Sequence, residues 1–205
     1  MKLRILKLVA AGAVLSLLAG CLEDWGYPVG SAYPYYAPQD LIVDPVLAGR
    51  WAAEGTTNEF WHFTVAGKKS YLLGVEDASA TNGVEEAPFE AHLFQLQQYH
   101  FLDLRTTNRV EYQLPVHLIS KVNYSDTNLS VQFLDWGWLT RVLETNPAVL
   151  SHILVPDPEK PDSTNDGMLV LTAPTADLQA FLLKHATDTN AFKDESADKL
   201  RRISR

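Results

Sequence analysis

Six histidines are the residues best suited to carry chemistry, and their spacing favours isolated side chains over a metal site. No two of them form a His-Glu-x-x-His pair or a comparable run of ligands. Two of them, His62 and His117, fall in segments that we expect to be strands, but single histidines on strand faces are the more common arrangement. We therefore predict no metal and no cofactor. The six are His62, His92, His100, His117, His152 and His185.

The acidic residues also lack the spacing of a catalytic pair or of a calcium-binding loop. Asp103 lies between Leu102 and Leu104 in an apolar segment, and strand alternation predicts that it faces solvent. A loop near residue 160 gathers several carboxylates without the regular alternation that calcium needs. Those carboxylates are Asp157, Glu159, Asp162 and Asp166. Without a Gly-x-Ser-x-Gly elbow as well, the sequence predicts no catalytic residue.

The only cysteine, Cys21, follows a segment with the features of an export signal. Positively charged residues come first, at Lys2, Arg4 and Lys7, and an apolar run extends from residue 8 to residue 18. A charged start, a short apolar run and small residues before a cleavage point are typical of secretory signals. The run is too short to span a bilayer comfortably. These features predict that residues 1–20 are a signal peptide.

The motif Leu18-Ala19-Gly20-Cys21 resembles the lipobox of bacterial lipoprotein precursors. The resemblance implies that Cys21 is lipidated, becomes the first residue of the mature chain and anchors it in the cell envelope. Leu22 is not the aspartate of an inner-membrane retention signal, so the resemblance implies the outer membrane, facing the periplasm, in a cell with two membranes. With Cys21 acylated, no thiol remains for a disulfide or a thiolate metal site.

Composition restricts the class of partner. The chain has 205 residues, 46% apolar residues and a net charge of -8, which suit one acidic globular domain. An acidic chain lacks the basic surface that nucleic acids and anionic lipid surfaces require. We expect a membrane partner through the lipid anchor, no nucleic acid, and either a small apolar ligand or an envelope protein.

Three regions follow the signal peptide. Residues 21–45, rich in Gly, Pro and Tyr, are expected to form a tether. Residues 46–187 are expected to form the domain. Residues 188–205 are polar and predict a frayed tail, whose removal from Asp194 onward should matter little.

Alternating apolar residues and turn signals predict eight strands, and two further segments have a helical pattern. Asp135 is expected to cap a helix that precedes the last strand, and Thr175 to cap a C-terminal helix. Sequential hairpins favour a mainly β fold, a meander that closes as an eight-stranded barrel. An open curved sheet with helices on one face is the alternative. The strands are expected near Trp51 and at residues 58–65, 70–76, 88–97, 99–106, 116–124, 128–134 and 168–172.

The motif Gly49-Arg50-Trp51 resembles the Gly-x-Trp at the first strand of lipocalins. The resemblance implies that Trp51 packs across the closed end of a barrel, next to a close backbone approach at Gly49. It also implies an arginine that covers the tryptophan, which the sequence does not identify. Five aromatic side chains are candidates to line the interior: Trp61, Phe63, Phe94, Phe101 and Phe133.

Three functions are compatible with these patterns. The first is a non-enzymatic, lipid-anchored envelope protein that binds a small apolar ligand in a lipocalin-like barrel. The second is a structural or assembly lipoprotein that binds a protein partner. The third is a hydrolase whose site only folding would assemble. An empty interior favours the first, and a filled interior beside an exposed apolar patch favours the second.

Overall fold

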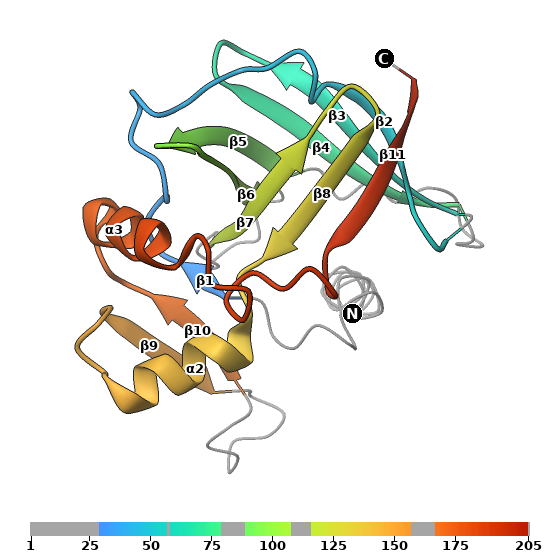
Figure 1. The fold of residues 1–205 in the computed structure, drawn as a ribbon. Coiled ribbons are helices and arrows are strands. Elements are labelled where there is room, and N and C mark those ends of the chain that lie inside the picture. Colours follow the sequence, from blue (N-terminus) through green and yellow to red (C-terminus); the bar gives the residue numbers. More distant parts are fainter. Residues whose placement is uncertain (1–28, 57, 79–88, 108–115, 157–166, 205) are drawn as a thin grey trace, which may run out of the picture.

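A closed antiparallel barrel forms the main body of the protein. The computed structural model describes residues 29–56, 58–78, 89–107, 116–156 and 167–204. Eight strands pair in a ring in the order β6-β5-β4-β3-β2-β11-β8-β7, and β7 pairs with β6 to close it (Figure 1). The predicted mainly β fold with an eight-stranded barrel is confirmed. The strands are β2 (Gly49–Ala53), β3 (Glu59–Ala66), β4 (Ser70–Asp77), β5 (Phe89–Leu96), β6 (Tyr99–Thr106), β7 (His117–Tyr124), β8 (Asn128–Phe133) and β11 (Asp198–Ser204).

The strand that closes the barrel is not the one that the sequence predicts. β11 lies between β2 and β8, with Leu200 opposite Ala53 on one side and opposite Leu129 on the other. Leu200 is buried, as are Ala191 and Phe192 in the segment before it. The predicted frayed tail at residues 188–205 is therefore wrong for the described residues up to 204. Two neighbouring strands supply the backbone partners that this polar segment needs.

The predicted tether is also shorter than expected. Residues 1–28, which include Cys21, lie outside the described residues. From Val29 onward the chain packs on the domain, where β1 (Gly30–Ser31) pairs with β7. Tyr35 is fully buried, and Leu41 forms a backbone bridge with Phe94. Prolines give this segment its extended path, but apolar side chains hold it against the barrel.

An insertion between β8 and β11 forms a second layer below the barrel in Figure 1. It contains α2 (Trp136–Thr145), β9 (His152–Pro156), β10 (Gly167–Leu171) and α3 (Thr175–His185). Asp135 caps α2 as predicted, because its Oδ1 accepts a hydrogen bond from the Trp138 amide at 2.6 Å. Thr175 does not cap α3. It is the first helical residue, and its hydroxyl donates to the Pro34 carbonyl at 2.8 Å.

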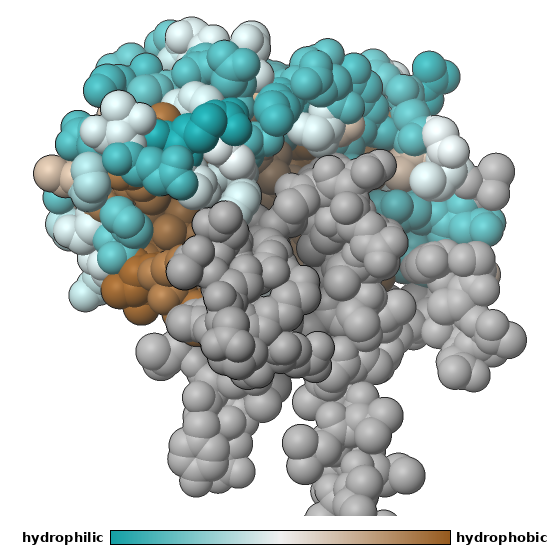
Figure 2. All heavy atoms as spheres, turned by 90° about the horizontal axis from the view of Figure 1, so that it is seen from below, coloured by the Kyte–Doolittle hydropathy of each residue, from teal (hydrophilic) through white to brown (hydrophobic). Residues whose placement is uncertain are grey.

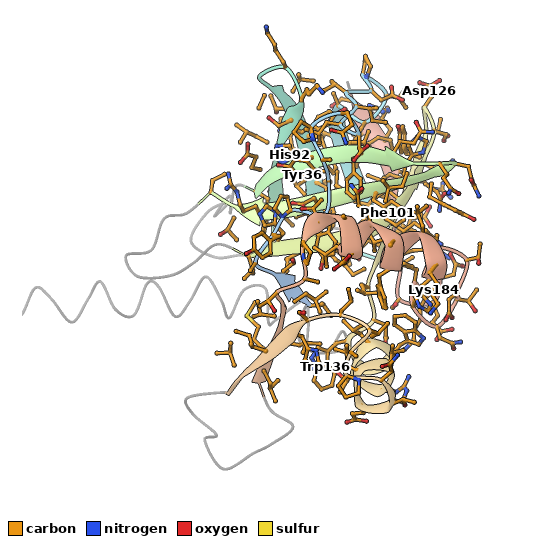
Figure 3. All side chains as sticks on the ribbon, turned by 90° about the vertical axis from the view of Figure 1, so that its left-hand side faces the viewer. Tyr36, His92, Phe101, Asp126, Trp136 and Lys184 are labelled. Carbon is orange, nitrogen blue, oxygen red and sulfur yellow. The ribbon has the colours of Figure 1, made fainter. Side chains whose placement is uncertain are left out.

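The protein has two apolar cores, one inside the barrel and one outside it. The inner core gathers side chains from all eight barrel strands, including Trp51, Tyr71, Leu93 and Leu102. The outer core lies between β5, β6 and β7 and the insertion, where Leu178, Phe181 and Leu182 of α3 are buried. Figure 3 shows Phe101 close to α3, and Phe101 belongs to the outer core.

Trp51 is held by an arginine from the closing strand. The guanidinium of Arg202 lies 4.1 Å from the centroid of the Trp51 ring. Arg202 also donates to the carbonyls of Ala48 and Asp126, at 2.7 Å each, and to that of Val46. The φ of +130° at Gly49 is one that side chains disfavour, which explains the glycine. The eight-stranded barrel is therefore compatible with lipocalin-like architecture, and Arg202 covers the Trp51 ring.

Candidate functional site

Within the described residues, the sheet ends at β9. β1 pairs with β10 in parallel, and β10 pairs with β9 in antiparallel register, with Leu169 opposite Leu154. Among the described strands, β9 is the last in the order, and its other edge has no strand beside it. An edge strand presents backbone N–H and C=O groups that can pair with a further strand. This edge can therefore accept a strand from another molecule.

The side chains of β9 make this edge apolar as well as open. Ile153, Leu154 and Val155 are 52%, 44% and 45% exposed. No Asp, Glu, Lys or Arg occurs from residue 148 to residue 156. Proteins usually protect edge strands from pairing with other chains by placing charged residues on them. The three consecutive exposed aliphatic residues of β9 leave this edge without that protection. Exposed apolar surface at such an edge indicates a binding surface.

A depression of about 310 Å³ lies beside β9, against α2. Leu154 and His152 line it from β9, and Trp136 and Leu143 line it from α2. Seen from below, apolar surface gathers on the side of the molecule where β9 and α2 lie (Figure 2). We call the exposed residues 153–155 together with this depression the β9 surface. It offers an aliphatic strand and an adjoining hollow that another protein can fill.

The described side chains inside the barrel, in contrast, pack against one another in the inner core. Trp61 and Phe63 lie in the inner core, where their ring centroids are 6.4 Å apart, and Phe63 packs edge-on against Tyr71. Phe133 is half-buried against the same core. These three aromatic residues lie where the sequence predicts, but they pack against their neighbours.

The other two predicted lining residues do not face the interior. Phe94 and Phe101 stack on one another in the outer core, with ring centroids 5.6 Å apart. Side chains alternate along a strand, so the inward residues of β5 and β6 are Leu93 and Leu102 instead. Placing Phe94 and Phe101 inside the barrel is therefore wrong, because the insertion and residues 29–41 create a second buried face.

A polar cluster fastens the N-terminal segment to the barrel. Asp103 is fully buried, which corrects the prediction that it faces solvent. Its Oδ1 lies 2.7 Å from Nδ1 of His117, and its Oδ2 accepts a hydrogen bond from the Tyr35 amide at 3.0 Å. The Gln179 side chain of α3 donates to the Tyr35 carbonyl at 3.1 Å. Both backbone groups of Tyr35 are thus satisfied by the barrel and α3.

Tyr36 and His92 extend this cluster. Their rings stack with centroids 4.6 Å apart, and they lie next to one another in Figure 3. Burial lowers the pKa of His92 below its ordinary value, although the neighbouring Glu90 opposes this effect. His92 and His117 are both nearly buried, so a substrate has little access to them. The cluster serves to attach the segment that leads to Cys21.

Replacing Asp103 with asparagine should destabilise the domain by about 1.5–3 kcal/mol, the range for a lost hydrogen bond to a charged group. The Asp103 carboxylate offers one oxygen to His117 and the other to the Tyr35 amide, and a side-chain amide has only one accepting oxygen. Urea unfolding of Asp103→Asn against the unchanged chain measures the difference. Equal midpoints for the two chains would show that this cluster does not hold the segment.

A second depression, of about 430 Å³, is acidic and lies near the start of β11. Glu59 of β3 and Asp198 of β11 line it, together with Glu54, Asp194 and Glu195. Within the described residues, no group of three or more His, Cys, Asp or Glu side chains is arranged to hold a metal ion. The acidic loop with Asp157, Glu159, Asp162 and Asp166 lies outside the described residues. We assign no ligand to this depression.

Asp198 makes the stability of the barrel depend on pH. Burial, and then the charge of Glu59, raise its pKa from 3.8 to about 7. The folded state therefore keeps a proton that the unfolded state releases, so the free energy of unfolding falls as pH rises from about 4 to 7. Asp198→Asn should remove this loss, and its melting temperature should exceed that of the unchanged chain by more at pH 8 than at pH 4.5. A constant difference at both pH values would contradict this.

Comparisons with known proteins add no relative. A scan against models of protein families, a search of curated proteins and a search of solved structures each found no match to this chain. In the described part of the chain, neither helix is long and apolar enough to cross a membrane.

Sequence reasoning missed the β9 surface, although a signal was present. Residues 153–155 are three aliphatic residues in a row, without the alternation that marks a strand with one wet face. The strands expected from the sequence do not include these residues, which precede Pro156. The absence of charged residues from residue 148 to residue 156 is the clearest signal in the sequence for this uncharged segment.

Proposed function

We propose that this chain is a non-enzymatic, lipid-anchored protein of the bacterial cell envelope that binds another protein through its β9 surface. The observation that carries the proposal is the exposed, uncharged edge strand of residues 153–155 beside an apolar depression. The filled barrel supports a role as a rigid scaffold for that surface. The lipobox resemblance at Leu18–Cys21 supports the anchor.

The route of the chain supports a binding site close to the membrane. Cys21 precedes Gly30, the start of β1, by nine residues, which span at most ~30 Å at about 3.3–3.6 Å per residue. β1 runs parallel to β10, with Gly30 opposite Val170, so the described chain enters β1 from the side on which β10 starts. At that end β10 is paired with Val155 of β9. The β9 surface would thus lie on the side of the anchor, and the proposed location is the periplasmic face of the outer membrane.

A carrier of a small apolar ligand is the second candidate function. The barrel and the Arg202–Trp51 contact favour it, because this architecture is compatible with that of lipocalins. The packing of Trp61, Phe63 and Tyr71 inside the barrel weighs against it. We therefore rank the carrier below the protein-binding function.

Photo-crosslinking in living cells tests the protein-binding function. A photoreactive amino acid replaces Leu154 in one variant and Leu72 in a control. Both leucines are 44% exposed, but Leu72 lies on β4, which is paired on both sides. We expect one discrete protein adduct at position 154, and its loss when Ile153→Lys is added. The same adducts at both positions, or none at position 154, would contradict the proposal.

The anchor has a separate test. Cys21→Ser should abolish labelling by a fatty-acid analogue and release the chain from the outer-membrane fraction, because acylated cysteine is the attachment point in this proposal. The Leu154 adduct should also weaken in this variant if the partner is at the membrane. Equal fatty-acid labelling of Cys21→Ser and the unchanged chain would overturn the anchor.

A further inference from the structure

We infer that the partner at the β9 surface is a second copy of this chain, whose β9 strand pairs with the first in antiparallel register about a twofold axis at Leu154. This inference rests on the proposed function, since it names the occupant of the same surface. The pairing of the two β9 strands joins the sheets of two copies into one continuous sheet. Each copy then covers the edge that the other leaves open.

The residues of β9 are complementary to themselves in this register. Leu154 of one copy faces Leu154 of the other, and Ile153 of each faces Val155 of the other. All three are aliphatic and roughly half exposed in one copy, so pairing buries apolar surface on both faces of the sheet. A twofold contact uses the same patch on both copies and closes after two chains, so it does not propagate into fibres.

The edge strand itself carries no charge that would oppose a second copy. The chain has a net charge of -8, and two such chains repel unless they meet at an uncharged strip. Residues 148–156 provide that strip, since they carry no Asp, Glu, Lys or Arg. A partner recruited by opposite charge would be expected to meet acidic residues at the contact.

The geometry of the sheet brings the two depressions together. His152 and Leu154 both line the depression against α2, as alternate residues of one strand face do. Residues directly opposite one another in an antiparallel pair lie on the same face of the sheet. The twofold axis therefore places both α2 helices on one face, and the two hollows adjoin across the Leu154 pair. A second copy therefore closes the side of the depression that is open at β9.

The barrel offers no comparable edge, and the anchor keeps copies together. Among the described strands, each barrel strand has a partner on both sides, and so do β1 and β10. If both copies are anchored within ~30 Å of one membrane, their β9 strands meet at similar heights. Because both copies are held at the same membrane, neither has to be captured from bulk solution before the strands pair.

Cysteine crosslinking tests both the contact and its register. With Cys21 acylated, Leu154→Cys supplies the only free thiol in the chain. Cα atoms directly opposite one another in an antiparallel pair are about 4.5–5.5 Å apart, within disulfide range. Ile153→Cys is the matched control, because the two copies of position 153 are diagonal neighbours, about 7–8 Å apart and outside that range. Leu72→Cys on β4 controls for random collision.

We expect a disulfide-linked dimer of Leu154→Cys on non-reducing gels, roughly tenfold more than for Ile153→Cys or Leu72→Cys. Co-expression of Ile153→Cys with Val155→Cys should restore the dimer between the two variants. Equal crosslinking at positions 153 and 154, or none at position 154, would overturn the inference. All four positions are roughly half exposed, so these substitutions should leave the fold intact.

The photo-crosslinking result separates this inference from the proposed function. An adduct at Leu154 with the mass of two copies supports both. An adduct with a different protein, and no dimer of Leu154→Cys, would overturn the self-pairing and leave the protein-binding function standing. The absence of any adduct at Leu154 would defeat both.

Discussion

A chain that ends at Lys193 should lose its cooperative unfolding transition. The deletion removes β11, which pairs with β2 on one side and with β8 on the other. Without it the barrel opens along its full length, and two strand edges become exposed. Leu200 leaves the inner core, and Arg202 leaves the Trp51 ring. Circular dichroism during heating measures the result, which we expect to be a broad, non-cooperative signal with aggregation.

Arg201→Ala is the control for this deletion. Arg201 is on the same strand, is exposed, and pairs with Glu54 at 2.6 Å. An exposed ion pair contributes about 0–1 kcal/mol, so this variant should melt almost as the unchanged chain does. If the truncated chain also melted cooperatively at nearly the same temperature, residues 194–205 would be the frayed tail that the sequence predicts.

Trp51→Ala should reduce the free energy of unfolding by about 3–5 kcal/mol, the range for a large buried side chain. Trp51 is fully buried, and its indole N–H donates to the Leu47 carbonyl at 3.0 Å. The substitution also removes the ring on which Arg202 lies. Chemical unfolding followed by circular dichroism measures the loss without relying on tryptophan fluorescence.

Tyr33→Ala provides the matched control, because Tyr33 is an aromatic residue with half of its surface exposed. Its removal should change the free energy of unfolding by less than about 0.5 kcal/mol. A small effect of Trp51→Ala, comparable to that of Tyr33→Ala, would show that the barrel end does not depend on this contact.

The barrel strands could be predicted from the sequence wherever one face of the strand is exposed to solvent and the other face is buried. β3 illustrates this, since Trp61 and Phe63 point inward while His62 and Thr64 are exposed. β11 gives no such signal. Its inward residues are Leu200 and Arg202, and the exposed Ile203 adds an apolar residue on the wrong face. An arginine that covers a tryptophan looks, in sequence alone, like a solvated charge.

The second buried face explains the other errors. On β5 the adjacent residues Leu93 and Phe94 are both fully buried, one in each core. Residues 91 to 94 are apolar except for His92. Such nearly continuous apolar runs are typical of strands in sheets that are covered on both faces. The sequence does not indicate which segments cover the outer face of β5. These segments are α3 and residues 29–41, which lie far from β5 along the chain.

The most direct test of the account is the binding of an environment-sensitive apolar dye to the mature chain carrying Cys21→Ser. The account places accessible apolar surface at β9 of a single, unpaired copy and packed side chains inside the barrel. Leu154→Lys should therefore abolish whatever dye binding the chain shows, while Leu72→Lys and Phe63→Leu should leave it unchanged. Saturable binding near one equivalent that survives Leu154→Lys and changes with Phe63→Leu would contradict the account and favour a ligand inside the barrel.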